Sequence, residues 1–222
     1  METAHARASE GAAHGTAIVA ERQVAGRGTR GRQWSSEPGG LWMSVIARPA
    51  RTDALEALSL RVGVAAANLL ELTCPALPRL GLKWPNDIVI DGRKLAGILC
   101  EARWGGGRCL WVVVGLGLNV RNAIPEELRG RAVTMANWDP AADPDALATP
   151  LAAAVALAAR EAGPLTSAEL RDFALRDALA GVRVTEPVAG TAVGITGTGA
   201  LRVRTDSGPM REVLAGVVAV PS

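Results

Sequence analysis

The chain has 222 residues, of which 49% are hydrophobic, and its formal net charge is +2. This length allows one large domain, or one domain with a small module, around a sizeable core. Positive and negative residues are mixed without a long basic block, which argues against nucleic acid as the main partner. The sequence shows no signal-peptide core and no membrane-spanning apolar run, so we expect a cytoplasmic protein without a membrane partner.

Histidine and cysteine usage limits the chemistry. His5 and His14 are the only histidines and lie near the start, which excludes a histidine-based triad elsewhere and a histidine-rich metal site. Cys74, Cys100 and Cys109 form no C-x-x-C pair, which fits free thiols in a reducing cytosol. Any catalysis must therefore rely on lysine, arginine, carboxylates and bound ions.

The first part of the chain predicts alternating helices and strands. The expected elements are a helix at 2–12, a short buried strand at 17–21, a strand at 41–48 and a helix at 54–72. Asp53 and Glu56 have the spacing of a capping box before the last helix. Leucine, valine and alanine recur along that helix at helical spacing, which gives it an apolar face.

Residues 26–34 read GRGTRGRQW, with glycines in the pattern G-x-G-x-x-G. The pattern is weak alone, because a dinucleotide-binding unit would open a helix after it and the following QWSSEPGG breaks any helix. One alternative is a loop whose backbone N–H groups hold an anion while the arginines add charge. Another is a solvated basic turn.

An Asp-Gly pair at 91–92 separates two β-rich runs. A tight type I′ turn needs positive φ at both central residues, and Asp-Gly is typical of it. We therefore expect paired antiparallel strands at 87–90 and 93–103. A third adjacent strand is expected at 109–115, reached through the glycine-rich turn at 105–107.

Lys94 follows this turn and precedes the small residues Ala96 and Gly97, where a ligand can approach the backbone closely. The alternative is an ordinary solvated lysine. Asn86 could read a base edge or cap a turn. Asp87 could hold magnesium or hydrogen-bond the local backbone.

The segment VVVGLGLNV at 112–120 places glycines at the end of a buried strand, followed by Asn119. Gly115 and Gly117 remove side chains where another molecule must fit. The alternative for these glycines is a β-bulge.

Residues 121–148 are rich in Asn, Pro and Asp, so loop with short helical turns is expected. Thr149-Pro150 predicts a helix at 150–162 that ends at Gly163. Thr166 and Glu169 repeat the capping-box spacing before another helix to about 180.

From 181 onward, short strands are split by Gly, Pro and Asp turns. The runs VRVTEPV, TAVGITG, ALRVRTD, REVL and GVVAV predict a small separate β-barrel, since no helix intervenes. The alternative is that these strands complete the main sheet.

Three segments together resemble the biotin protein ligases: AERQVAGRGTRGRQW, KWPNDIVIDGRKLAGILCEAR and VGLGLNV, in this order and spacing. The C-terminal strands are similar to that family's small barrel. The resemblance implies an α+β fold, with a mixed or antiparallel sheet flanked by helices as in class II synthetases and lipoate ligases. It implies a catalytic domain at 1–178 and an SH3-like β-barrel at 179–222.

The implied activity is that of a biotin–[acetyl-CoA-carboxylase] ligase. Biotin and ATP, with Mg²⁺, would give biotinyl-5′-AMP, and a lysine of a biotin carboxyl carrier protein would then attack it. The alternatives are a lipoate or octanoate ligase, and a noncatalytic biotin- or adenylate-binding protein. The chain resembles the monofunctional type without a DNA-binding domain, as a monomer or homodimer.

The resemblance also assigns residues. It implies catalytic roles for Arg27 and Lys94. It implies biotin contacts at Gln23, Gly26, Arg27, Lys94, Gly97, Gly115 and Gly117. It implies ATP or adenylate contacts at Gly28, Thr29, Arg30, Gly31, Trp34, Asn86, Asp87 and Asn119. It implies no metal cage built by the protein, with Asp87 as a candidate magnesium contact.

The sequence departs from the family pattern in two places. A D-S-T-N-type segment, whose Ser and Thr hold the ureido ring, would have its third position at Met1, so we expect a start upstream or a truncation. The family usually has arginine at Thr29, and we expect faster loss of biotinyl-AMP unless Arg30 or Arg32 substitutes.

Overall fold

A six-stranded antiparallel sheet forms the centre of the computed structural model, which describes residues 1–220 apart from the side chain of Arg30. The strand order is β1-β2-β6-β5-β4-β3, and each neighbouring pair is antiparallel. The strands are β1 (Ala17–Ala20), β2 (Leu41–Ala47), β3 (Gly81–Lys83), β4 (Asp87–Ile90), β5 (Arg93–Gly105) and β6 (Arg108–Leu118). The predicted α+β class is confirmed.

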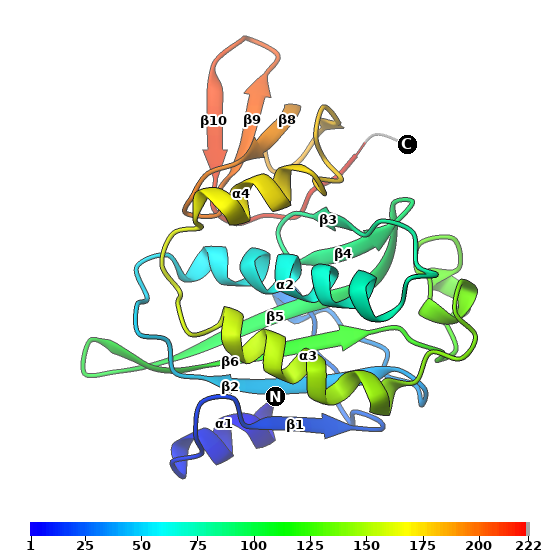
Figure 1. The fold of residues 1–222 in the computed structure, drawn as a ribbon. Helices are drawn as coiled ribbons and strands as arrows, with labels where there is room; N and C mark the ends of the chain where they lie inside the picture. The colour runs from blue at the N-terminus through cyan, green and yellow to red at the C-terminus, as the bar shows by residue number, and fades with distance from the viewer. Residues whose placement is uncertain (221–222) are drawn as a thin grey trace.

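Helices cover the two faces of this sheet unequally. Figure 1 shows α2 (Leu58–Thr73) and α3 (Pro144–Ala158) side by side across one face. The shorter α1 (Glu2–Ser9) packs near the β1 edge against the other face. The remaining helical segments are α4 (Ser167–Ala174), η1 (Thr29–Gly31), η2 (Leu55–Ala57), η3 (Glu126–Leu128) and η4 (Met135–Asn137).

Side-chain alternation along the strands separates two cores. Val45 of β2 and Val114 of β6 belong to the large core beneath α2 and α3. Ile46 and Val113 instead point to the opposite face, where they pack against Ala4 of α1. The part of that opposite face that α1 leaves uncovered is where the candidate site lies.

The Asp-Gly hairpin is confirmed, with φ of 49° at Asp91 and 74° at Gly92. The third adjacent strand is also confirmed, and it extends to Leu118. The three-residue strand β3, which was not expected, pairs with β4 beside the same hairpin. Three residues are too few for an alternating pattern to show in a sequence.

Two expectations near the start are wrong. The strand at Ala17–Ala20 is an edge strand, and Val19 is 47% exposed, so it is not buried. The capping box is absent as well, because Asp53 pairs with Arg51 at 2.7 Å between Nη2 and Oδ2. The expected helix at 54–72 begins as η2 and continues as α2 without a recorded side-chain cap.

The expected start of the third helix is also wrong. The helix begins at Pro144, and the Asp143 carboxylate accepts a hydrogen bond from the Asp145 backbone N–H. Asp143-Pro144 gives the same start signal as Thr149-Pro150, six residues earlier. Pro150 lies inside the helix, and it is tolerated there while Leu151 stays in the core.

The following helix has the expected capping box. Thr166 accepts from the Glu169 backbone N–H, and the Glu169 carboxylate accepts from the Thr166 backbone N–H. This helix, α4, ends at Ala174, earlier than the predicted 180. Figure 1 shows it between the main sheet and the C-terminal strands.

A second, four-stranded antiparallel sheet stands beyond α4 (Figure 1). Its order is β10 (Met210–Val213), β9 (Leu201–Thr205), β8 (Gly190–Ile195) and β7 (Arg183–Val184). Within residues 1–220 the pairing leaves this sheet open where a closed barrel was expected. Residues 216–220 add one isolated bridge, from Ala219 to Glu186, where a strand was expected. The domain division at 178 stays a prediction.

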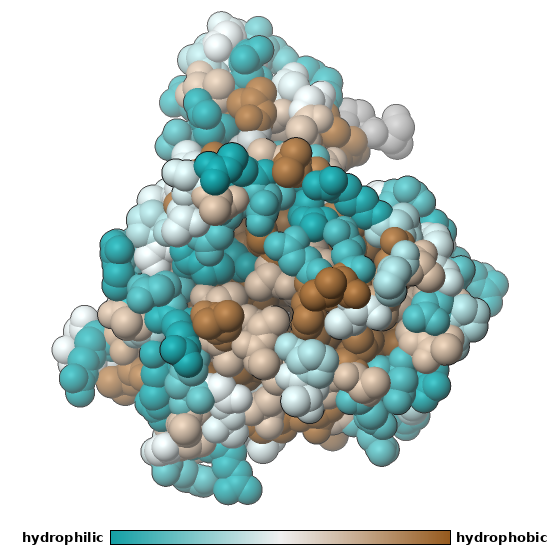
Figure 2. All heavy atoms as spheres, in the orientation of Figure 1, coloured by the Kyte–Doolittle hydropathy of each residue, from teal (hydrophilic) through white to brown (hydrophobic). Residues whose placement is uncertain are grey.

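The helix-covered face carries apolar side chains among polar ones, as Figure 2 shows. Leu72 of α2 and Leu157 of α3 are 78% and 68% exposed. No helix in residues 1–220 is long and apolar enough to cross a membrane.

Candidate active site

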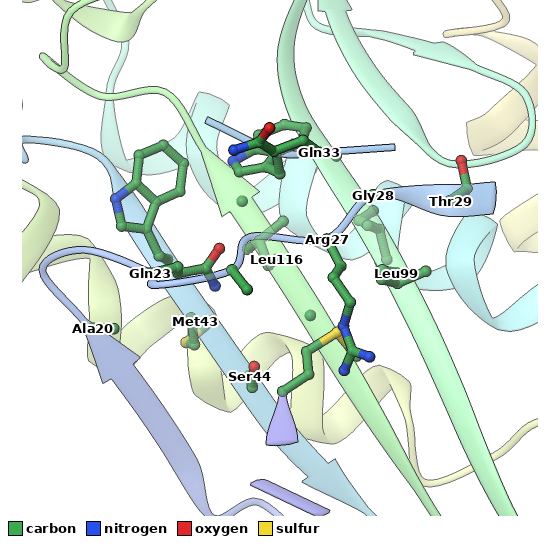
Figure 3. A pocket seen from close by; sticks show the side chains of 18 of the residues that line it. Ala20, Gln23, Arg27, Gly28, Thr29, Gln33, Met43, Ser44, Leu99 and Leu116 are labelled. Carbon is green, nitrogen blue, oxygen red and sulfur yellow. The ribbon is translucent and has the colours of Figure 1, made fainter. Parts of the chain in front are cut away.

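A cavity of about 640 Å³ opens on the sheet face opposite α2 and α3. Its floor comes from β2, β5 and β6, and the 21–34 loop passes over it (Figure 3). The candidate residues that line it are Gln23, Arg27, Gly28, Thr29, Trp34, Asn86, Asp87, Lys94, Gly97, Gly115 and Gly117. A volume of this size is typical of small-molecule sites.

Three glycines on the floor of the cavity leave space above the sheet because they have no side chains. Gly97 of β5 and Gly117 of β6 are directly paired, and Gly115 pairs with Ser44 of β2. An added Cβ would come within 2.8 Å of the Trp34 ring at Gly97 and within 2.7 Å of it at Gly117. The pairing is regular at these positions, so the β-bulge interpretation is wrong and the glycines make room above the sheet.

A bulge does occur beside Lys94, and it sets the direction of that side chain. The register shifts between Ile88 and Val89 of β4, so that Ala96 pairs with the first and Lys94 with the second. Leu95 and Ala96 therefore both face the core, and both are fully buried. Strict alternation would have put Lys94 on the core side, whereas the bulge turns it into the cavity.

The Lys94 ammonium has two close neighbours. Its Nζ lies 2.6 Å from Asp87 Oδ1 and 4.9 Å from the centroid of the Trp34 ring. A carboxylate and an aromatic face both attract an ammonium group. The solvated-lysine alternative is therefore wrong, since this side chain is held in place within the cavity.

The 26–34 loop folds back on itself as a narrow hairpin. Trp34 donates its backbone N–H to the Gly26 carbonyl, and Gly28 donates to the Arg32 carbonyl. The tip holds only the short η1, so no dinucleotide-type helix follows the glycines. Gly31 has φ 72°, which a tight tip requires.

Three candidate contacts lie off the cavity wall. A Cβ on Gly26 would come within 2.3 Å of the Trp34 carbonyl oxygen, so this glycine serves loop packing. Gly31 is at the loop tip. Asn119 is buried behind Lys94, where its Nδ2 donates to the Lys94 carbonyl at 3.5 Å. The candidate role of Arg30 lies outside the described side chains.

Arg27 and Lys94 occupy different ends of the floor. Arg27 extends from the loop toward the strands (Figure 3), and its Nη2 lies 3.5 Å from Glu101 Oε2. The Lys94 ammonium instead lies over Gly97, 3.1 Å from that residue's Cβ position, whereas Glu101 is further along β5. The catalytic role expected for Arg27 stays a prediction, since its guanidinium is paired with Glu101.

Two further polar residues line the cavity. Ser44 was not predicted, and Arg32 was named only as a substitute for the arginine that the family usually has at position 29. Ser44 is 4% exposed and lies on the cavity floor. A serine within an otherwise apolar strand was the signal for it. Arg32 lines the cavity too, and its Nη2 donates to Thr29 Oγ1 at 3.2 Å. Thr29 itself carries no charge but orients a neighbour that does.

Cationic side chains outnumber carboxylates along the described lining of the cavity. Its described lining side chains include the cations of Arg22, Arg27, Arg32 and Lys94, against the carboxylates of Glu2 and Asp87. Asn86 lines the same region and donates its Nδ2 to the Ile98 carbonyl at 2.6 Å. Within residues 1–220, no group of three or more His, Cys, Asp or Glu side chains is placed to hold a metal ion.

Residues 3–119 match the Biotin/lipoate A/B protein ligase family, which is more than half of the chain. The chain belongs to this family. Residues 181–220 also match the biotin protein ligase C-terminal domain. The resemblance stated from the three motifs is therefore confirmed.

Curated ligases of this family are clearly similar in sequence. The bifunctional ligase/repressor BirA of Bacillus subtilis is 39% identical over 140 residues, which cover 61% of this chain and 42% of BirA. The biotin–[acetyl-CoA-carboxylase] ligase of Paracoccus denitrificans is 40% identical over 108 residues, 48% of this chain and 45% of the relative. These matches span less than half of each relative's length.

Solved structures of family members have the same fold. The biotin protein ligase of Aquifex aeolicus in complex with biotin and ATP superposes with a TM-score of 0.83 at 26% identity. That match covers 99% of this chain and 95% of the other. The Leishmania major enzyme in complex with biotinyl-5-AMP gives a TM-score of 0.62 at 25% identity, covering 96% and 94%.

Proposed function

We propose that this chain is a biotin protein ligase that joins biotin to a carrier lysine through biotinyl-5′-AMP. The observation that carries the proposal is the cavity itself, in which a glycine floor runs up to the clamped ammonium of Lys94. The floor suits a fused-ring head with a short chain. The lysine end suits the carboxylate at the tip of that chain.

In the first step, a biotin carboxylate oxygen attacks the α-phosphorus of ATP, and the bond to pyrophosphate breaks. Two anions must approach each other, which costs about 4 kcal/mol at a separation of about 4 Å in a partly buried site. Lys94 lies at the end of the floor where these groups would meet. A cation fixed there offsets the repulsion and stabilises the charge that develops on the phosphate.

Trp34 is suited to hold the nucleotide. Its ring lies over Gly97 and Gly117, and its Nε1 is buried without a hydrogen-bond partner in the described residues. An aromatic face and a free N–H together fit a purine. Asn86 lies at the same end and offers its carboxamide oxygen. We assign both residues to the adenylate.

Magnesium fits this site only as an ion brought by the triphosphate. Mg²⁺ commonly binds one or two carboxylates together with substrate phosphates. Asp87 is the lining carboxylate nearest to Lys94, but its Oδ1 is already engaged by that ammonium. We therefore assign Asp87 mainly to holding Lys94, with the metal masking charge on the departing pyrophosphate.

In the second step, the neutral amine of the carrier lysine attacks the acyl carbon, the bond from that carbon to the phosphate oxygen breaks, AMP leaves, and the nitrogen releases a proton to water. Chemistry of this kind requires positioning and charge stabilisation more than a nucleophile from the enzyme. The carrier is a biotin carboxyl carrier domain. No histidine or cysteine of this chain is needed.

The test is ATP-dependent transfer of labelled biotin to a purified carrier domain. Lys83 and Lys94 are the two lysines of the chain, which offers a matched control. Lys94→Ala should abolish transfer, whereas Lys83→Ala should retain it, because Lys83 is not among the lining residues. Labelled lipoate and octanoate separate the related acyl ligases. Binding of biotin without transfer would indicate a noncatalytic binding protein.

A further inference from the structure

A short turn joins β3 to β4 at the edge of the main sheet nearest the second sheet (Figure 1). It consists of Trp84, Pro85, Asn86 and Asp87. The Asp87 carboxylate, at the end of the turn, lies 2.6 Å from the ammonium of Lys94. A contact that fixes the start of this turn can therefore affect the position of that ammonium.

The second sheet makes such a contact through the turn between β8 and β9. The Trp84 indole is 2% exposed, and its Nε1 donates to the Gly199 carbonyl at 2.8 Å. Gly199 has φ of 86°, and a Cβ at this position would lie 2.8 Å from Ala57 Cα in η2. The β8–β9 turn is thus packed closely on the main body, and its carbonyl is a fixed acceptor for the indole.

The middle of the β3–β4 turn is held by two other parts of the main body. The Pro85 carbonyl accepts a hydrogen bond from Ser59 Oγ of α2 at 3.0 Å. Asn86 Nδ2 donates to the Ile98 carbonyl of β5 at 2.6 Å, and the Asn86 backbone carbonyl accepts from the Ile98 N–H at 2.9 Å. Each residue of the turn therefore has its own polar contact, which makes the turn a stiff link.

We propose that Trp84 is a positioning residue for Lys94, and that the second sheet supplies its anchor at Gly199. The inference rests on the proposed function, in which Lys94 stabilises the charge that develops as biotin is adenylated. The hydrogen bond holds the start of the turn, the turn holds Asp87, and Asp87 holds the ammonium. A fixed charge is effective because it is preorganised, so a loosened turn should slow adenylation.

The indole N–H gives Trp84 a task that burial alone does not require. Any large apolar ring can fill the space, and losing it would lower stability without a specific effect on turnover. A hydrogen bond weakens steeply when its geometry is distorted, so the bond to Gly199 also fixes the orientation of the ring. Trp84→Phe separates the two roles, because it keeps an apolar ring and removes the N–H.

The first test is biotin-dependent exchange between pyrophosphate and ATP, measured well below the melting temperature of each variant. Trp84→Phe should lower kcat about fivefold, with the KM for biotin nearly unchanged. Gly199→Ala, whose added Cβ would displace the β8–β9 turn, should lower kcat in the same way.

Val203→Ala is the matched control for stability. Val203 is fully buried in β9, and its truncation should destabilise the second sheet without removing the indole contact. It should therefore leave kcat unchanged. Equal losses of kcat in Val203→Ala and Trp84→Phe would overturn the inference, because general loosening of the second sheet would then explain both.

The route through Asp87 is tested in a second background. Trp84→Phe should have no further effect on kcat in Asp87→Asn, because the link to Lys94 is already broken there. Losses that multiply in the double variant would overturn this route, since Trp84 would then affect catalysis without Asp87.

The lysine content allows a measurement without turnover. Lys83 and Lys94 are the only lysines, so selective ¹³C labelling of lysine gives two sets of side-chain signals, which Lys83→Arg assigns. The Lys94 Nζ lies 4.9 Å from the centroid of the Trp34 ring, so the ring current should shift the signals of the adjacent CH₂ protons. Trp84→Phe should reduce this shift, and Val203→Ala should preserve it.

An unchanged Lys94 signal in Trp84→Phe would also overturn the inference. If the parent protein exchanged pyrophosphate with lipoate or octanoate and not with biotin, the proposed function would be wrong, but the Lys94 signal would still decide the positioning role. If Trp84→Phe fails to fold, Gly199→Ala serves in both measurements.

Discussion

Lys94 and Asp87 meet across the β4–β5 pairing, with the ammonium 2.6 Å from a carboxylate oxygen. The bulge at Leu95 makes this meeting possible, because it turns Lys94 from the core face to the cavity face. The carboxylate holds the ammonium in place before substrate arrives. Such preorganisation is what makes a fixed charge effective in catalysis.

Asp87→Asn should therefore slow adenylate formation without abolishing it. The amide keeps the size of the side chain but removes the charge that holds Lys94. We expect a fall in kcat of about tenfold, against a loss of at least about a thousandfold for Lys94→Ala. Single-turnover formation of biotinyl-AMP measures both. Equal losses in the two variants would instead give Asp87 a direct role in the chemistry.

Gly117→Ala should disturb the Trp34 ring rather than the fold. Its Cβ would lie 2.7 Å from an atom of the indole, and Gly97→Ala would give a contact of 2.8 Å. Either substitution would force the Trp34 ring to move. We therefore expect ATP binding to weaken about tenfold, with little change in thermal stability. Calorimetric titration with ATP measures the effect.

Gly63→Ala is the matched control, because it lies in α2 outside the main cavity and its Cβ would have ordinary contacts of 3.4 and 3.5 Å. It should leave ATP affinity unchanged and stabilise the helix slightly, since alanine favours helix over glycine. If Gly63→Ala weakened ATP binding as much as Gly117→Ala, displacement of the Trp34 ring could not explain the loss of affinity.

The sequence allowed the motif segments to be placed correctly, because turn chemistry is local. Asp91-Gly92 requires positive φ at both positions, and no distant residue can change that requirement. The capping box of Thr166 and Glu169 is local in the same way. Asp53 failed as a cap because Arg51, two residues away, competes for the carboxylate.

The positions of the two key cations depend on tertiary structure. Nothing local marks Leu95 as a bulged residue, yet the bulge decides that Lys94 faces the ligand. Arg27 is held by Glu101, which is distant in sequence and comes close only through the sheet register. A family resemblance can name both residues, but it cannot show that they lie at opposite ends of one floor.

Arg32→Ala should speed the escape of biotinyl-AMP. Arg32 lines the cavity and donates to the carbonyl and hydroxyl oxygens of Thr29, so its charge is held beside the ligand. We expect the release rate to rise about tenfold, and Thr29→Val, which keeps the carbonyl, to have a smaller effect. Release of labelled adenylate into a trap measures the rate.

Thr29→Arg tests whether the position usually occupied by arginine still matters. If Arg32 already supplies the missing charge, Thr29→Arg should slow release only slightly in the parent. It should slow release strongly in the Arg32→Ala background. Release unaffected by Arg32→Ala would rule out Arg32 as the substitute.

The ion pair between Glu71 and Arg176 should make stability fall in acid. The hydrogen bond from Arg176 is the main cause that lowers the pKa of Glu71 below its ordinary value of 4.5. A lowered pKa means that the folded state holds the carboxylate ionised. Its contribution is therefore present above about pH 4.5 and is lost as pH falls through the folded-state pKa.

Glu71→Gln should lower the melting temperature at pH 7 and flatten its decline between about pH 5 and pH 3. Burial raises the pKa of Asp177, which has the opposite sign and favours the folded state in acid. Both proteins contain Asp177, so the difference in melting temperature between Glu71→Gln and the parent at each pH excludes its contribution. If the melting temperatures of the two proteins fell by the same amount as the pH was lowered, the assignment to Glu71 would be wrong.

Trp84 joins the second sheet to the main body, and its removal should cost stability. The indole is 2% exposed, and its Nε1 donates to the Gly199 carbonyl at 2.8 Å. Trp84→Phe would leave that buried carbonyl unsatisfied, which costs about 1–3 kcal/mol in the free energy of unfolding. Trp104→Phe, at a 54% exposed position, should change it by less than about 0.5 kcal/mol. Urea unfolding measures both, and equal effects would show that the hydrogen bond to Gly199 does not fasten the second sheet.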